Sequence, residues 1–126
     1  MARTAVRSLP AAEGAVVTKA VLRAASRLGV SNRALARVLG LSEATVSRMG
    51  SGSYVLAPEE KPFELAILFL RLFRSLDAIV AGDEASARAW LTHEHEVLGG
   101  APGVLIQSLA GLVGVVGYLD ARRALL

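Results

Sequence analysis

Two histidines and two glutamates alternate in the segment His93-Glu94-His95-Glu96, and these side chains are potential metal ligands. Ligands that share one face stand about four residues apart on a helix and two apart on a strand. The segment leads into Gly99 and Gly100 and is typical of a loop, and no further ligands with suitable spacing accompany it. We therefore expect no metal site and no cofactor. The four side chains are expected to be solvated or to make polar contacts with a partner.

Residue patterns that support catalysis are missing. The chain has no Cys, which removes thiol nucleophiles, disulfides and thiolate zinc sites. It has no phosphate-binding glycine loop after a strand and no Gly-x-Ser-x-Gly turn. Its carboxylates are few and stand where helix caps or surface groups are expected. The sequence therefore predicts a protein that is not an enzyme.

The strongest pattern runs from Ser31 to Met49, where small and apolar residues recur at the spacing of two packed helices. Ala36 is small enough for a helix crossing, Gly40 permits a turn with positive φ, and Val46 can plug back into the first helix. The surrounding core positions are Leu35, Leu39, Leu41 and Met49. This segment resembles the Xre/Cro-type helix-turn-helix, whose second helix lies in the major groove of DNA. The alternative is a helical hairpin without a DNA-binding role.

By that resemblance, the second helix presents polar side chains to DNA, and the candidate DNA-binding residues are Arg33, Arg37, Ser42, Ala44, Thr45, Ser47 and Arg48. Arg48 can make a bidentate contact to guanine, the hydroxyls can reach a phosphate or a base edge, and Ala44 can touch a thymine methyl. Arg33 and Arg37 on the first helix can pair with phosphates, which adds affinity without sequence choice.

Charge divides the chain into two unlike halves. The net charge is +3, but residues 1–61 hold nine Lys or Arg and four Asp or Glu, whereas residues 62–126 hold five bases and seven acids. A basic first half suits a polyanionic partner, and the second half needs another explanation. A solvated helical surface is the alternative for the basic half.

The elements that position these residues are helices. A chain of 126 residues that is 53% hydrophobic and has no disulfides must be stabilised by packing or by a partner. We expect helices over 16–28, from the cap Ser31 to Leu39, after the cap Ser42, from Pro58 towards Ala81, from the cap Asp83 to Leu91, and from Val104 to the C-terminus. Pro62 either lies in the first turn of the helix that starts at Pro58 or moves the start of that helix later. The sequence predicts an all-α fold, with an N-terminal arm and helix-turn-helix domain in residues 1–61 and a small helical domain in residues 62–126.

One stretch is long enough to raise the question of a membrane span. The 23 residues between Glu96 and Asp120 carry no charge. Four of the first seven are glycine or proline, however, and the remaining 104–119 segment would be about 24 Å long, shorter than a bilayer core of about 30 Å. We therefore expect a buried or interface helix, in which Gly111, Gly114 and Gly117 could pack closely on another helix. Because no signal peptide is visible, a cytoplasmic location is expected.

A second pattern follows the first and is spread over the rest of the chain. It comprises Leu56-Ala57-Pro58-Glu59-Glu60, Gly82-Asp83, Ala87-Arg88-Ala89-Trp90-Leu91, Leu98-Gly99-Gly100, Pro102, Leu105, Ile106, Ser108, Gly111, Val115 and Leu119. With the helix-turn-helix, it resembles the antitoxins of the Xre/MbcA/ParS family over residues 24–120. The resemblance implies that the second domain binds a toxin. On physical grounds alone, Trp90 would anchor the loop that follows it, and Pro102 would restart the helix.

The resemblance also implies the nature of the partner, a RES-domain toxin that consumes NAD by phosphorolysis, hydrolysis or ADP-ribosyl transfer. The candidate toxin-binding residues are Trp90, Leu98, Gly99, Gly100, Pro102, Arg122, Arg123, Leu125 and Leu126. In such pairs the antitoxin covers the toxin's active site and its C-terminal end can reach the NAD pocket. Arg122 or Arg123 could there meet acidic or phosphate-binding groups, or could instead complement the dipole of the last helix.

Two functions follow from these patterns. The chain is predicted to be an antitoxin that neutralises the toxin and represses its own operon; the alternative is a free-standing Xre-like regulator whose second domain only dimerises. The long helix is apolar on more than one face, which favours a homodimer or a higher hetero-oligomer with the toxin. A two-fold dimer would present two recognition helices to a palindromic operator. Alternatively, the chain itself buries this helix on all sides.

Overall fold

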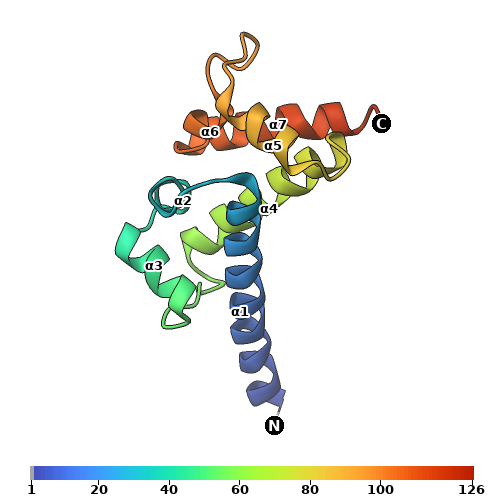
Figure 1. Ribbon diagram of the computed structural model, residues 1–126. Coiled ribbons are helices and arrows are strands. Elements are labelled where there is room, and N and C mark those ends of the chain that lie inside the picture. The colour runs from blue at the N-terminus through green and yellow to red at the C-terminus, as the bar shows by residue number, and fades with distance from the viewer. Residues whose placement is uncertain (1) are drawn as a thin grey trace.

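The computed structural model describes the backbone of residues 2–126 and the side chains from residue 12 onwards. Within this range the chain forms seven α-helices and no strand (Figure 1). They are α1 (Ala2–Leu28), α2 (Asn32–Leu39), α3 (Glu43–Ser51), α4 (Lys61–Ile79), α5 (Glu84–Thr92), α6 (Pro102–Leu105) and α7 (Leu109–Arg123). The predicted all-α fold is confirmed. None of the described helices is both long and apolar enough to cross a lipid bilayer.

Helices α2 and α3 begin after serine residues that cap them and end at glycine residues. Ser31 Oγ accepts a hydrogen bond from the Ala34 amide, and Ser42 Oγ accepts one from the Thr45 amide. Gly40 ends α2 in the left-handed conformation, with φ of 70°, as the turn requires. Helix α3 continues to Ser51 and is capped by Gly52, with φ of 85°.

The structure decides two helix starts. Helix α1 begins at Ala2 rather than near Val16, so the predicted N-terminal arm is part of this helix. Helix α4 begins at Lys61, which is the later start that Pro62 allows, rather than at Pro58. A helix that began at Pro58 would place Pro62 beyond the positions whose amides need no intrahelical partner, where its missing N–H would cost a hydrogen bond. With the start at Lys61, Pro62 lies in the first turn, which tolerates it.

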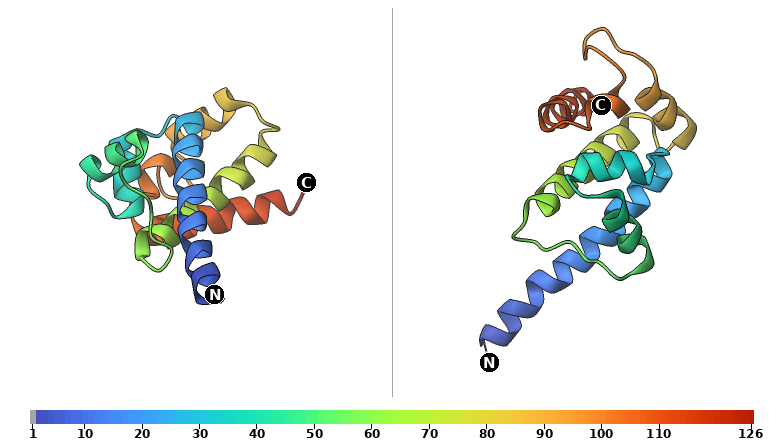
Figure 2. Two further views of the ribbon diagram at one scale, coloured as in Figure 1. Left: turned by 90° about the horizontal axis from the view of Figure 1, so that it is seen from below. Right: turned by 90° about the vertical axis from the view of Figure 1, so that its left-hand side faces the viewer.

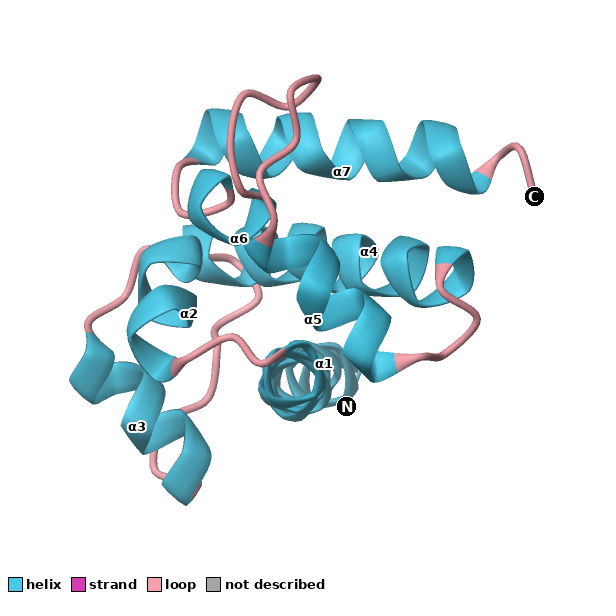
Figure 3. Ribbon diagram, turned by 45° about the horizontal axis from the view of Figure 1, so that its top comes forward, coloured by secondary structure: helices cyan, strands magenta, loops and turns pink. Residues whose placement is uncertain are grey.

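Helix α4 is the centre of the molecule. It packs against α1 on one side and α7 on the other, while α2 and α3 lie together beside its N-terminal end (Figures 2 and 3). Its side chains Phe69, Leu72 and Leu76 are fully buried. The buried Ser75 donates a hydrogen bond of 2.8 Å to Asp120 of α7, which also pairs with Arg71. The two halves of the chain therefore share one core, which α4 spans.

Arg88 of α5 joins the second half to α1. Its guanidinium donates hydrogen bonds of 3.0 Å to the carbonyls of Arg27 and Ser26, in the last turn of α1. These are carbonyls that a helix end leaves without an intrahelical partner. Asp83 caps the start of α5. Its carboxylate accepts hydrogen bonds from the hydroxyl and the amide of Ser86, and these bonds, mainly the one from the hydroxyl, hold the pKa of the Asp83 carboxyl below its ordinary value.

The predicted continuous helix from Val104 to the C-terminus is wrong. The chain instead forms the short α6, a turn over residues 106–108, and α7, which Ser108 caps through the Gly111 amide. Gly111 shows why the break is tight: a Cβ at this position would lie 1.8 Å from the Leu105 carbonyl oxygen. Only glycine allows the end of α6 to approach α7 this closely.

Candidate functional site

One exposed side of α3 carries a hydrogen-bonded row of three polar side chains, Ser42, Thr45 and Arg48, which we call the α3 row. The hydroxyls of Ser42 and Thr45 share a hydrogen bond of 2.8 Å, and Arg48 Nη2 donates to Thr45 Oγ1 at 3.0 Å. The residues stand three apart and so follow one face of the helix. Val46 and Met49, on the neighbouring side of the helix, are buried. The row therefore presents an oriented guanidinium to solvent from a helix that the core holds in place.

The remaining DNA-binding candidates lie around this row and on α2. Ala44 and Ser47 are exposed on α3. Arg33 and Arg37 are exposed on α2, but they line a separate hollow of about 220 Å³ together with Ser31, Ala34 and Gln107. The structure thus gathers the α3 candidates on one helix and sets the two arginines of α2 apart.

Trp90 lies in the middle of an aromatic row that joins three elements of the second half. Its ring stacks on Tyr118 of α7, with centroids 6.3 Å apart, and lies 5.0 Å from the ring of His95. His95 Nε2 also bonds to the Trp90 carbonyl at 3.0 Å. Arg122 completes the row, since it lies over Tyr118 and donates to its hydroxyl. Trp90 therefore anchors the 93–101 loop, as the sequence predicts.

The 93–101 loop projects beyond α5–α7 (Figure 1) and is closed on itself by backbone hydrogen bonds. The His95 amide donates to the Gly100 carbonyl, and Gly99 has a φ of 82°. Leu98 and Gly100 are partly buried, Gly99 is exposed, and Pro102 is buried at the start of α6. Because its side chain packs inside the chain, Pro102 supports the 93–101 loop from the interior and is not itself exposed.

The histidines of the loop bond to α5 rather than to one another. His93 Nδ1 donates to the Ala89 carbonyl at 2.6 Å, and His95 bonds to the carbonyl of Trp90. Within the described residues, no three His, Cys, Asp or Glu side chains gather as a possible metal site.

The outer face of α7 belongs to the segment that the sequence predicts to be a buried or interface helix, but none of its residues is among the predicted toxin-binding residues. It consists of six exposed apolar or small residues: Leu109, Ala110, Val113, Gly114, Gly117 and Ala121. Leu109 and Val113 are 60% and 52% exposed. A surface helix normally turns polar residues to solvent, so an uncharged outward face is typical of a surface that a partner covers. The interval without charged residues between Glu96 and Asp120 signals such a helix in the sequence. It does not show which face of the helix packs on the core and which face is exposed.

The last residues of the chain continue from α7 into solvent. Arg122 and Arg123 lie in the last turn of the helix. Leu125 and Leu126 follow it and are 83% and 77% exposed. The chain thus ends in two exposed leucines next to two exposed arginines.

Comparisons with known families match both halves of the chain. Residues 8–71 match the antitoxin Xre-like helix-turn-helix domain, and residues 75–124 match the antitoxin Xre/MbcA/ParS C-terminal toxin-binding domain. The chain belongs to this antitoxin family. The predicted resemblance is confirmed, and with it the role of an antitoxin that has toxin and DNA as its classes of partner. No curated protein matches the antitoxin.

The two matched segments can be placed on the antitoxin's fold. The first takes in α2, α3 and the α3 row, and the second takes in Trp90, the 93–101 loop and α7. They meet between residues 71 and 75, inside α4, whereas the boundary proposed from sequence lies just after the start of α4. Since α4 packs on both halves, the two matched segments share one central helix.

Proposed function

We propose that the antitoxin neutralises a RES-domain, NAD-consuming toxin by covering the toxin's active site. We further propose that it represses its own operon as a homodimer that reads a palindromic operator. The RES identity of the toxin rests on the family resemblance. The mode of action that fits best is binding alone, with no catalytic step by the antitoxin.

The observation that carries the toxin-binding proposal is the outer face of α7. This face lies within the residues that match the toxin-binding domain, and it exposes Leu109 and Val113 to solvent. Burying two such side chains at an interface gives roughly 1.5–3 kcal/mol each, before the cost of ordering. Trp90 and the 93–101 loop lie beside α7 through the Trp90–Tyr118 stack and would extend the same interface.

The C-terminal residues are proposed to enter the toxin's NAD pocket. Arg122 and Arg123 would meet carboxylates or phosphate-binding groups there, and Leu125 and Leu126 would be buried on binding. Deletion of residues 121–126 tests this part alone. We expect neutralisation to weaken; a deleted form that protects cells fully would show that the end of the chain does not block the pocket.

The DNA-binding part of the proposal is supported by the α3 row. Arg48 is fixed to Thr45, which in turn is fixed to Ser42, so little side-chain freedom is lost when the guanidinium meets a base. Arg33 and Arg37 would hold phosphates.

Co-expression tests the proposed function as a whole. The reading frame next to the antitoxin gene is expected to encode a RES-type protein that stops growth when expressed alone. We expect the antitoxin to restore growth and NAD levels and to co-purify with that protein. A neighbour of another class, or a RES protein that neither binds the antitoxin nor is silenced by it, would overturn the proposal in favour of a free-standing regulator.

A further inference from the structure

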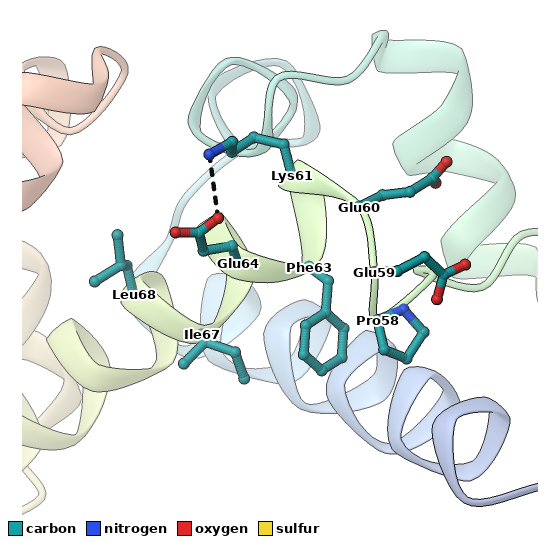
Figure 4. Close-up of a pocket in the computed structure, with 8 residues that line it drawn as sticks. All are labelled: Pro58, Glu59, Glu60, Lys61, Phe63, Glu64, Ile67 and Leu68. Atoms are coloured by element: carbon teal, nitrogen blue, oxygen red, sulfur yellow. Dashed lines mark hydrogen bonds and ion pairs between the residues drawn. The ribbon is translucent and has the colours of Figure 1, made fainter. Parts of the chain in front are cut away.

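An apolar patch lies between α1 and α4, on the side that no other helix covers. It consists of Val16, Val17, Phe63 and Ile67, which we call the α1–α4 patch. Val16 is 66% exposed and Ile67 is 44% exposed. The patch lines a hollow of about 440 Å³ and borders a second hollow of about 540 Å³ at the start of α4 (Figure 4). None of its residues belongs to the α3 row or to the outer face of α7.

Charge is distributed unequally around this patch. At one end lie four exposed acids and one base: Glu13, Glu59, Glu60, Glu64 and Lys61. Two exposed arginines lie toward the other end. Arg23 follows Val16 by seven residues on α1, and Arg74 follows Ile67 by seven residues on α4. Seven residues are two helical turns, so each arginine lies about 10 Å along the same side of its helix from the apolar residue. Helices α1 and α4 run in the same direction here, because Arg27 lies over Phe73.

The arginines at the basic end are available for a partner. Arg23 and Arg74 form no ion pair with any side chain that the structure describes, and the same holds for Glu59 and Glu60 at the acidic end. Along the direction of α1 and α4, the surface is therefore acidic at one end, apolar in the middle and basic at the other end. Such an arrangement is complementary to itself after a half turn.

We propose that a second copy of the antitoxin docks on the α1–α4 patch with its helices antiparallel, so that the acidic end of each copy meets Arg23 and Arg74 of the other. A two-fold axis through the centre of the patch satisfies both ends at once and buries the apolar residues between them. The proposal rests on the homodimer in the proposed function and names its surface. The recognition helices and the outer face of α7 lie outside this contact.

Complementary charge reversal tests this surface in the full-length antitoxin. One variant carries Arg23→Glu and Arg74→Glu, and a second carries Glu60→Arg and Glu64→Arg. Each variant alone places like charges at both ends of the interface, so we expect its dimer dissociation constant to rise roughly tenfold or more. An equimolar mixture pairs opposite charges at both ends, so we expect dimers to re-form as a heterodimer. Light scattering with size-exclusion chromatography, with one variant tagged, measures both results.

Controls separate this proposal from the proposed function. Glu94→Arg with Glu96→Arg carries the same charge change on the 93–101 loop and should leave the dimer intact, and circular dichroism should show that every variant is helical. A wild-type dimer that neither variant weakens, or a mixture that stays monomeric, would overturn the α1–α4 surface and leave the homodimer standing. A monomeric wild-type antitoxin would overturn both the α1–α4 surface and the homodimer. Toxin binding, measured by Trp90 fluorescence, would still test neutralisation independently.

Discussion

The α3 row and the outer face of α7 are the two surfaces that we propose bind DNA and toxin, and they are built by opposite means. The α3 row is polar, and its three members bond to one another within seven residues of chain. The outer face of α7 is apolar and lacks such bonds, and its position depends on residues distant in sequence, such as the Ser75–Asp120 hydrogen bond. A surface of the first kind suits a charged, regular ligand such as DNA, and one of the second kind suits a folded protein partner.

The comparison implies that the two surfaces can be disabled separately, although α4 joins them in one core. Changes on the outer face of α7 should affect the toxin and spare the operator, and changes in the α3 row should do the reverse. A variant of exposed residues that abolished both would contradict this account.

The largest effect is expected from acidic residues on the outer face of α7. Leu109→Asp with Val113→Asp removes two aliphatic contacts and buries two charges at the interface. We expect affinity for the toxin to fall by roughly 100-fold or more, because both the lost burial and the desolvation act against binding. Calorimetric titration with the toxin measures this loss. Operator binding by the same variant should be unchanged. If the toxin affinity of the variant stayed within roughly two- to threefold of the wild-type value, the toxin would have to dock on another surface.

Two glycines of α7 sharpen the comparison at the level of stability. Gly111→Ala should lower the free energy of unfolding by about 1–3 kcal/mol, because the new Cβ would collide with the Leu105 carbonyl. Gly114→Ala is the matched control. It meets no atom within 4 Å in the antitoxin alone and should raise stability by up to about 1 kcal/mol. Urea denaturation of both variants checks this pair, and equal effects would show that the turn before α7 is not tight.

Arg48→Ala is expected to act on the first surface alone. Operator affinity should fall by roughly 10- to 100-fold, the cost of one bidentate base contact, while growth protection against the toxin persists. Gel-shift measurements at fixed salt, with Ser51→Ala as an exposed control at the end of α3, measure the loss. If Arg48→Ala bound the operator as tightly as the control, the α3 row would not read DNA.

A smaller effect is expected from the two arginines of α2. Arg33→Ala and Arg37→Ala should each weaken operator binding uniformly across sequences and reduce the slope of log affinity against log salt by about 1. Toxin binding through an apolar face should show little salt dependence in the same range. A steep salt dependence for the toxin as well would erase the contrast between the two surfaces.

The sequence predicts the local features of this fold well. Ser31, Ser42 and Asp83 were recognised as helix caps because the signal of a cap lies within three residues of it. The turn at Gly40 was recognised for the same reason. The DNA-binding candidates on α3 accordingly lie together on one helix.

Features that depend on distant contacts were predicted less well. The break before α7 was missed because it depends on the close approach of Gly111 to Leu105, which hydropathy does not report. The start of α4 was left open between Pro58 and a later start set by Pro62, and the later start is the one that forms. Gly114 and Gly117 were expected to pack on a helix of the same chain or of a partner; each faces open space in the antitoxin alone, on the surface proposed for the toxin.

Hydrogen exchange of the antitoxin, alone and bound to a catalytically inactive form of its toxin, tests the central claim most directly. The account predicts that amides of α7 and of the 93–101 loop exchange more slowly in the complex than in the antitoxin alone, while those of α2 and α3 exchange equally in both samples. Protection confined to α2 and α3, or α7 amides that are equally shielded with and without the toxin, would contradict the claim that the second half is where the toxin docks.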